Sequence, residues 1–192
     1  PKALALALGA RLRLNGSGTP ITGLIGRLES AGAKGGWGYP FSWAHRDARI
    51  PRGTPNAVVT AFAGHVLLDA EEAGFSVSEA TLHAAGSFIV HRLRRVSGPE
   101  GTFCFSYTPV DRRAVHNASI LAASLLARLS DRLSEPGWLD PALAATRFTL
   151  AAQRQDGSWP YGVTGRNQWV DSFHTGYVLV ELDRLSARAS LA

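Results

Sequence analysis

Two histidines are the residues of this sequence best suited to proton transfer. His116 and His174 each stand near the start of a strongly apolar segment, close to Asn117 and Asp171 respectively. Asp171 precedes His174 by three residues, so on a helix the two side chains would share a face. A carboxylate beside an imidazole fixes its tautomer and raises its pKa, which suits general acid–base catalysis. The spacing predicts His174 and Asp171 as an acid–base pair with His116 as a counterpart, and a purely structural role is the alternative.

Three polar loops carry further candidates. Trp43, Tyr107 and Trp169 could stack on sugar rings, and the hydroxyl of Tyr107 is a fourth catalytic candidate. Arg46 and Arg166 could hold a carboxylate or a pyrophosphate. The remaining substrate-binding candidates are polar residues near the starts of apolar segments: Asp47, Asn56, Asp111 and Asn117. Helix capping is the alternative for Asn56, Asn117 and Asp171. Asp47, Asp111 and Asp171 could also pair as glycosidase carboxylates, with a separation that sequence does not provide.

A glycine–aromatic motif recurs along the chain and organises these loops. Residues 35–39 read Gly-Gly-Trp-Gly-Tyr, residues 101–105 read Gly-Thr-Phe-Cys-Phe, and residues 157–161 read Gly-Ser-Trp-Pro-Tyr. Each motif is followed by a polar loop and an apolar segment, at 55–71, 115–131 and 171–185. We expect Trp37, Trp159 and Tyr161 to pack between hairpins. The pattern predicts repeated helical hairpins, in the order outer helix, turn, inner helix.

Apolar spacing supports these helices. Ala118, Leu121 and Leu125 belong to a pattern that covers most sides of the third segment, which predicts a helix buried nearly all round. Residues 82–96 carry a single apolar stripe, as an outer helix would, and residues 3–14 also read as helix. Three helix starts are expected from cap signals: Thr54-Pro55, Asp140-Pro141, and a capping box of Ser76 with Glu79.

The predicted fold is all-α, with tandem hairpins that form part of an α/α-toroid in a single domain over residues 1–192. Concentric helices in this order build such a toroid, and too few hairpins are present to close one. The chain also begins at Pro1 and contains no Met. These two features predict that an N-terminal portion is missing.

Composition narrows the classes of function. Of 192 residues, 45% are hydrophobic and 18% charged, which is typical of a globular domain. The net charge of +5 raises nucleic acid as a partner, but the arginines mostly fall near helix ends without interleaved aromatic residues. We therefore expect no nucleic-acid partner. The single Cys104 excludes an intramolecular disulfide and a cysteine-rich zinc site, and no metal or phosphate-cradling motif occurs. The sequence thus predicts no metal, no cofactor, no transmembrane segment and a cytoplasmic location, and it leaves the oligomeric state open.

One repeat resembles a known enzyme class. Gln153, Gly157 and Trp159, with Phe148 upstream, are similar to the Gln-x-x-x-Gly-x-Trp repeat core of squalene and other triterpene cyclases. The acidic Asp-x-Asp-Asp motif of those cyclases is missing from the chain, and so is the Asp-x-Cys zinc pair of protein prenyltransferases, since Thr102 precedes Cys104. The resemblance therefore implies the toroid fold without those chemistries.

A second resemblance covers nearly the whole chain. Residues 37–41, 55–60, 106–109, 116–119, 156–159 and 173–177 together resemble a bacterial family of toroid proteins often encoded among polysaccharide-biosynthesis genes. Its members sometimes carry the label δ-aminolevulinic acid dehydratase. That enzyme is a β/α barrel with a Schiff-base lysine, whereas this chain has Lys34 as its only lysine beyond the first few residues and no β/α alternation.

This resemblance implies an enzyme or enzyme-like protein of surface-polysaccharide metabolism. Its substrate would be a sugar or a lipid-linked sugar, held in a central cavity and approached at a membrane surface where it is lipid-linked. Two alternatives remain: a non-catalytic module that binds a glycan, an isoprenoid or a peptide, and an isoprenoid cyclase or transferase. A fold shared by many chemistries does not choose among them.

Overall fold

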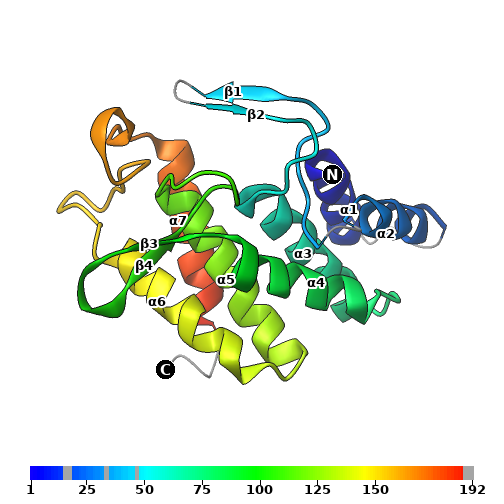
Figure 1. Cartoon of the computed structure of the whole chain (residues 1–192). Coiled ribbons are helices and arrows are strands. Elements are labelled where there is room, and N and C mark those ends of the chain that lie inside the picture. The colour runs from blue at the N-terminus through cyan, green and yellow to red at the C-terminus, as the bar shows by residue number, and fades with distance from the viewer. Residues whose placement is uncertain (15–18, 33–34, 46–47, 188–192) are drawn as a thin grey trace.

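The computed structural model describes residues 1–14, 19–32, 35–45 and 48–187, and these are mostly helical (Figure 1). Helices dominate as predicted, and the strands β1 (Trp43–His45), β2 (Ala48–Ile50), β3 (Arg95–Ser97) and β4 (Phe103–Phe105) are three residues each. They form two antiparallel ribbons, β1 with β2 and β3 with β4. In the part of the chain that is described, no helix is long and apolar enough to cross a membrane.

The helices form two rows. The first row packs consecutive neighbours side by side: α1 (Lys2–Arg13), α3 (Ala57–Glu72), α5 (His116–Arg132) and α7 (Ser172–Ser186). The second row packs on the first, with α2 (Thr19–Ala31) against α1 and α3, α4 (Glu79–Arg92) against α3 and α5, and α6 (Leu139–Leu150) against α5. Short 3-10 turns, Pro99–Gly101, Pro136–Trp138 and Gly165–Asn167, lie in the connections. The alternation of second-row and first-row helices follows the predicted order of hairpins.

Burial differs between the helices as their apolar patterns predict. α3 and α5 are buried on most sides, whereas α4 buries one stripe that includes Leu82, Phe88 and Ile89. The two end helices of the first row are less covered. Leu6 on α1 and Phe173 on α7 remain 55% and 62% exposed. The core therefore lies between the two rows, centred on α3 and α5.

Two helix caps match the capping alternatives, and three predicted starts are wrong. Asn56 caps α3 by accepting a hydrogen bond from Val59 N at 2.9 Å, and Asp171 caps α7. Asn117, by contrast, lies inside α5, whose N-cap is Val115. The Thr54 start fails because Pro55 pairs with Gly38 in an extended bridge.

The other two starts are shifted along the chain. The turn Pro136–Trp138 runs directly into α6, so Asp140 is already helical and does not cap it. Ser78 caps α4 in place of Ser76, and Glu79 becomes the first helical residue.

Hydrogen bonds define the repeat more sharply than the sequence does. Trp37 N donates to Thr60 Oγ1 at 3.0 Å, Phe105 N to Ser119 Oγ at 3.0 Å, and Trp159 N to Thr175 Oγ1 at 3.4 Å. Each hydroxyl lies four residues after the residue that caps its helix. Phe105, and not Phe103, is therefore the equivalent of the two tryptophans, and the predicted alignment is wrong by two residues.

The corrected alignment has two consequences. Trp37 and Trp159 pack as predicted, since both indoles are buried and donate through Nε1 to carbonyls of the preceding second-row helix, Leu28 O at 2.7 Å and Thr149 O at 2.8 Å. Two residues beyond the three aromatic positions stand Tyr39, Tyr107 and Tyr161. Three successive repeats thus present a tyrosine at the same place.

Candidate functional site

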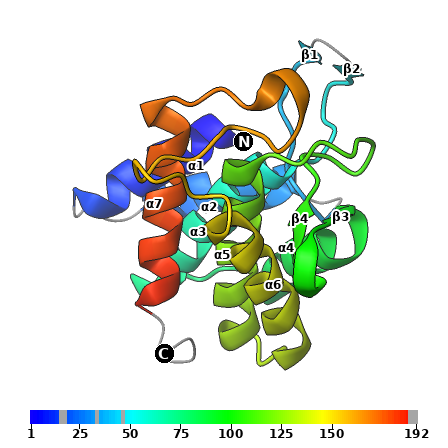
Figure 2. The ribbon, with the colours of Figure 1, turned by 90° about the vertical axis from the view of Figure 1, so that its left-hand side faces the viewer.

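The loops that precede α3, α5 and α7 gather at one end of the molecule, as both ribbon views show (Figures 1 and 2). The loops before α5 and α7 are each tied to the first-row helix of the repeat before them. Ala57 N donates to Tyr107 O, and His116 N donates to Tyr161 O, both at 3.0 Å. These bonds satisfy amides that the first turn of a helix leaves unpaired. The tyrosines of the repeats are therefore held beside the N-terminal ends of the first-row helices.

Five aromatic side chains at this end form what we call the aromatic rim: Tyr39, Trp43, Tyr107, Tyr161 and Trp169. Trp43 packs edge-on against Tyr107 with ring centroids 5.6 Å apart, and Tyr161 stacks on Trp169 at 4.5 Å. Burial and the adjacent phenol of Tyr39 raise the pKa of Tyr107 far above its usual value. Its hydroxyl therefore stays protonated and acts as a hydrogen-bond donor, not as a base.

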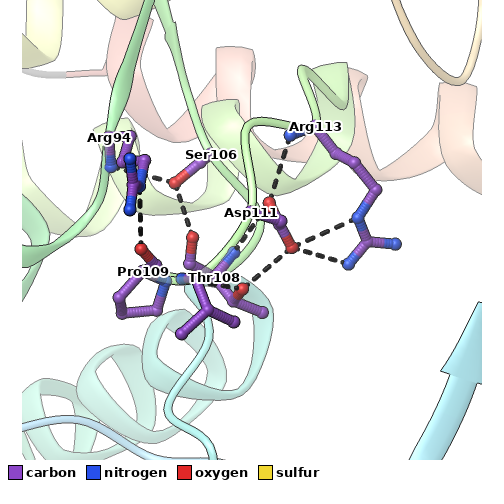
Figure 3. A network of polar contacts seen from close by, with 7 residues as sticks. Arg94, Ser106, Thr108, Pro109, Asp111 and Arg113 are labelled. Carbon is purple, nitrogen blue, oxygen red and sulfur yellow. Dashed lines mark hydrogen bonds and ion pairs between the residues drawn. The ribbon is translucent and has the colours of Figure 1, made fainter. Parts of the chain in front are cut away.

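One guanidinium lies within the rim. Arg113 sits 5.1 Å from the ring centroid of Trp43 and 5.0 Å from that of Tyr107, which is cation–π geometry. Asp111 holds it with Oδ2 at 2.8 Å from Nη2 and 3.2 Å from Nε (Figure 3). Burial raises the pKa of Tyr161, and the positive charge of Arg113 opposes that rise. The guanidinium therefore acts on Tyr161 as well as on Trp43 and Tyr107.

Asp111 also shapes the loop that carries Arg113. Its carboxylate accepts hydrogen bonds from Thr108 Oγ1 at 2.8 Å and from Arg113 N at 3.1 Å. Arg94 braces the other side of this loop, because its Nε donates to Pro109 O at 2.9 Å (Figure 3). Asp111 therefore positions Arg113, and its contact with a substrate stays a prediction.

The predicted pair of His174 and Asp171 is formed. Asp171 Oδ1 accepts from His174 N to cap α7, and its Oδ2 lies 2.7 Å from His174 Nδ1. An ionised carboxylate only accepts hydrogen bonds, so Nδ1 carries a proton, and in the neutral form of the ring Nε2 is the acceptor nitrogen. Burial acts to raise the pKa of Asp171, but its hydrogen bonds to His174 outweigh that effect and lower the pKa. Rings of Tyr161 and Trp169 lie 4.7 and 5.2 Å from the imidazole.

His116 occupies a different environment from His174. It is 2% exposed, its ring stacks on Phe148 with centroids 5.7 Å apart, and burial lowers its pKa to about 4. The ring is therefore neutral at pH 7. Among the described residues, no carboxylate is hydrogen-bonded to its Nδ1 as Asp171 is to that of His174. The alignment of the helix caps also separates their positions, because His116 directly follows the cap Val115 whereas His174 is the third residue after Asp171. The predicted equivalence of the two histidines is therefore wrong in position as well as in chemistry.

Buried polar atoms without partners cluster near these helix starts. Asn56 Nδ2, His116 Nδ1 and Asn117 Oδ1 are buried and have no hydrogen-bond partner among the residues that the structure describes. Such atoms are rare in folded proteins, so each of the three is a candidate hydrogen-bonding group for a molecule bound at this end. All three belong to the N-terminal ends of α3 and α5, beside the aromatic rim.

The structure does not unite every predicted residue. Arg166 is exposed on the turn Gly165–Asn167, and among the described residues no hydrogen bond, ion pair or cation–π contact joins it to the rim. Arg46 and Asp47 lie outside the described residues. Sequence reasoning missed Arg113 and Tyr39 and assigned Tyr161 to packing alone. The signal that could have found the tyrosines is the aromatic-x-Tyr spacing of residues 37–39, 105–107 and 159–161.

Within the described ranges, no three His, Cys, Asp or Glu side chains are grouped so as to hold a metal ion. What the site offers chemically is a set of aromatic faces, one partly neutralised guanidinium and one imidazole with an available nitrogen. Comparison with protein-family models, with curated proteins and with solved structures finds no match for this chain.

Proposed function

We propose that this chain is part of an α/α-toroid that binds a sugar or a lipid-linked sugar at the aromatic rim, in surface-polysaccharide metabolism in the cytoplasm. The observation that carries the proposal is the gathering of five aromatic rings with Arg113 and the His174–Asp171 pair from three separate repeats. Sugars present apolar C–H faces to aromatic rings and hydroxyls to polar groups, and this site contains both kinds of partner.

The roles of the residues follow from their environments. Trp169, 44% exposed, offers an accessible ring, and the phenol of Tyr107 donates a hydrogen bond. Arg113 provides a positive charge for a carboxylate or a pyrophosphate. Asp111 already forms an ion pair with this guanidinium, which weakens its attraction for an anionic ligand. His174 would act as the general base through Nε2, with Asp171 holding the ring.

Tryptophan fluorescence tests this proposal directly. The chain has five tryptophans, of which Trp37, Trp138 and Trp159 are buried in the core, so Trp43 and Trp169 report on the rim. Nucleotide-sugars and lipid-linked oligosaccharides should change the emission of the wild type, and Trp169→Phe should lose part of the response. Trp138→Phe is the matched control and should retain it. A panel that produces no response and no turnover would refute the proposal.

Turnover separates enzyme from binding module. If a sugar binds and no product forms, the non-catalytic alternative is correct. An isoprenoid ligand is the second candidate, and a specific observation favours it: Phe173, Tyr177 and Phe62 form an unbroken run of ring contacts, at 4.8 and 5.8 Å, that leads away from the rim. Binding of polyprenyl phosphates in preference to every sugar would support that candidate.

A further inference from the structure

Each of the three loops that precede α3, α5 and α7 carries an exposed large apolar side chain. These loops lie at the end of the molecule that bears the aromatic rim, which we call the rim end (Figures 1 and 2). Phe41, Val110 and Trp169, one from each loop, are 56%, 64% and 44% exposed, and Val170 is exposed as well. Phe41 stacks on Tyr39 of the rim with ring centroids 5.4 Å apart. Exposed apolar residues gathered in this way indicate a contact surface.

Arginines brace two of these loops directly before the exposed apolar residue. Arg94 Nε donates to Pro109 O at 2.9 Å, and Arg154 Nη2 donates to Gln168 O at 3.1 Å. In both loops the residue that follows the bonded carbonyl is the exposed apolar one. Arg94 and Arg154 are themselves exposed. The fold therefore places a positive charge beside two of the three apolar side chains.

Further positive charge at the rim end has no carboxylate partner. Four arginines of the three loops have exposed side chains and form no ion pair with another residue that the structure describes: Arg49, Arg52, Arg112 and Arg166. The opposite end of the first row differs, because Arg128 Nη2 lies 2.7 Å from Asp69 Oδ1 and Arg132 Nε lies 2.7 Å from Glu71 Oε2. Unpaired positive charge therefore accumulates at the rim end.

The carboxylates near these arginines do not cancel this charge. Asp111 forms an ion pair with Arg113, and the carboxylate of Asp171 is bonded to His174. Asp156, in the turn before the third loop, accepts hydrogen bonds from the amide and the hydroxyl of Ser158. Within the described ranges, seven arginines lie in the three loops or are bonded to them, against these three carboxylates. The rim end is therefore both apolar and net positive.

We propose that the rim end docks on an anionic lipid bilayer, with Phe41, Val110 and Trp169 at the depth of the headgroups and the arginines against the lipid phosphates. The inference builds on the proposed function, because the sugar of a lipid-linked substrate lies at such a surface. Proteins that lie in the membrane interface combine apolar and basic side chains, and tryptophan favours that depth. Cytoplasmic leaflets carry anionic lipids, which attract nearby arginines. In the docked molecule the rim faces the headgroups.

Co-sedimentation with lipid vesicles tests the docking. The wild type should bind vesicles of phosphatidylcholine mixed with phosphatidylglycerol, bind phosphatidylcholine alone far more weakly, and lose affinity as salt is added. Arg52→Gln combined with Arg112→Gln should weaken binding about 25-fold, because each arginine near an anionic surface contributes about fivefold. Val110→Ser should weaken it about tenfold, the lower end of the effect of burying a valine side chain. Equal binding of the wild type to both kinds of vesicle would overturn the inference.

Matched controls lie at the far end of α1. This helix begins beside Tyr177, over whose ring Lys2 lies, and a helix of its length spans about 18 Å. Arg11 and Arg13 are exposed near its last turn, and Leu14 is 82% exposed. Arg11→Gln combined with Arg13→Gln, and Leu14→Ser, should bind the vesicles as the wild type does. If these variants lose as much affinity as those at the rim end, the face is wrong and the inference fails.

Fluorescence determines which face touches the lipid. Brominated acyl chains should quench the emission of Trp43 and Trp169 in the bound protein, since the other three tryptophans are buried in the core. Binding without quenching would place another surface on the membrane and contradict the proposal. Double-stranded DNA is the rival polyanion. If DNA displaces the vesicles and Val110→Ser binds vesicles normally, the surface recognises negative charge alone, and docking on lipid is refuted.

The outcomes separate the docking from the proposed function. If soluble nucleotide-sugars change rim fluorescence while the wild type binds neither kind of vesicle, the docking is refuted and the proposed function stands. If anionic vesicles bind at the rim end and no sugar binds with or without lipid, the docking stands and the proposed function is refuted.

Discussion

Asp171 uses its two oxygens for two tasks, because one caps α7 and the other holds the ring of His174. The capping and catalytic hypotheses for this residue are therefore compatible. Local spacing was enough to predict the pair, since residues three apart share a helical face. Arg113 could not be predicted in the same way. Its partner Trp43 belongs to another repeat, and only the packing of α3 against α5 brings the two together.

Substitutions at Asp171 should separate its two tasks. Asp171→Asn keeps an oxygen that can accept from His174 N, so stability should change little, while sugar turnover or binding falls as the ring loses its carboxylate. Asp171→Ala removes both contacts and should cost about 1 kcal/mol more of unfolding free energy, the typical value of an N-cap. Urea unfolding measures the difference. Equal stability of the two variants would show that the cap contributes nothing.

Removal of His174 tests catalysis separately from folding. The side chain is 23% exposed, so His174→Gln should leave the melting temperature nearly unchanged. If the protein is an enzyme, turnover should drop about 10²- to 10⁴-fold, the usual contribution of general acid–base catalysis. A large fall in melting temperature with a matching loss of turnover would instead assign His174 to the fold.

At the scale of the elements, apolar periodicity predicted α3, α5 and α7 well, but α2 was not predicted, and residues 95 and 96 at the end of the predicted outer helix belong to strand β3. The starts of the helices were less predictable still. Several residues that could cap a helix stand within a few positions of each other, and tertiary contacts determine which of them becomes the N-cap. The Gly38–Pro55 bridge moves the start of α3 to a later residue than predicted, and the turn at Pro136 moves the start of α6 to an earlier one. The alignment of the second repeat failed for a related reason. Phe103 and Phe105 both stand in β4 and are both buried, so composition alone does not tell them apart.

Close packing of α4 on the turn Pro136–Trp138 should be sensitive to a single methyl group. A Cβ added at Gly86 would lie 2.1 Å from the ring of Trp138, which is 7% exposed and has little room to move. Gly86→Ala should therefore destabilise the protein by about 1–3 kcal/mol, the usual cost of overpacking. Thermal unfolding gives the measurement.

Gly26→Ala in α2 is the matched control, because an added Cβ there meets no atom within 4 Å. This change should stabilise the protein by about 0.4–1 kcal/mol, since alanine restricts the unfolded chain. If both variants shift the melting temperature in the same direction, helix propensity and not the contact with Trp138 controls the effect at Gly86.

At the scale of the whole molecule, the sequence predicted a helical array, and the two rows agree with that arrangement. Closure into a toroid stays a prediction. What sequence could not supply is the convergence of separate loops at one end, because it depends on how consecutive hairpins are offset. The buried pair of His65 and Glu181 illustrates the same limit. His65 was expected in the core, but its partner is on α7, two first-row helices further along the chain.

Acid should destabilise the molecule before most carboxylates titrate. Burial lowers the pKa of His65, and it lowers that of His116 from its usual 6.5 to about 4. The unfolded chain therefore binds more protons than the folded one between these values, and stability falls as pH drops from about 7 to 4. Glu181, whose pKa is also lowered, adds to the loss below its unfolded pKa of about 4.3.

His116→Phe should reduce this acid sensitivity, because phenylalanine can keep the stacking on Phe148 and does not titrate. The contribution of His116 between pH 7 and 4 is about 3 kcal/mol, since one pKa unit corresponds to about 1.4 kcal/mol. Denaturant unfolding at several pH values measures the slope. An identical slope in the variant and the wild type would mean that His116 titrates normally in the folded protein.

Every tyrosine of the chain lies on or next to the aromatic rim: the chain has four, and Tyr39, Tyr107 and Tyr161 are joined by Tyr177, whose pKa is raised by burial and by the nearby Tyr39. Biosynthetic replacement of tyrosine by 3-fluorotyrosine would therefore label this end of the molecule and nothing else. A fluorine NMR spectrum would contain four resonances, one for each repeat tyrosine and one for Tyr177 on α7. Titration of any compound, whatever its chemical class, would then show which of the three repeats it approaches and whether it reaches Tyr177.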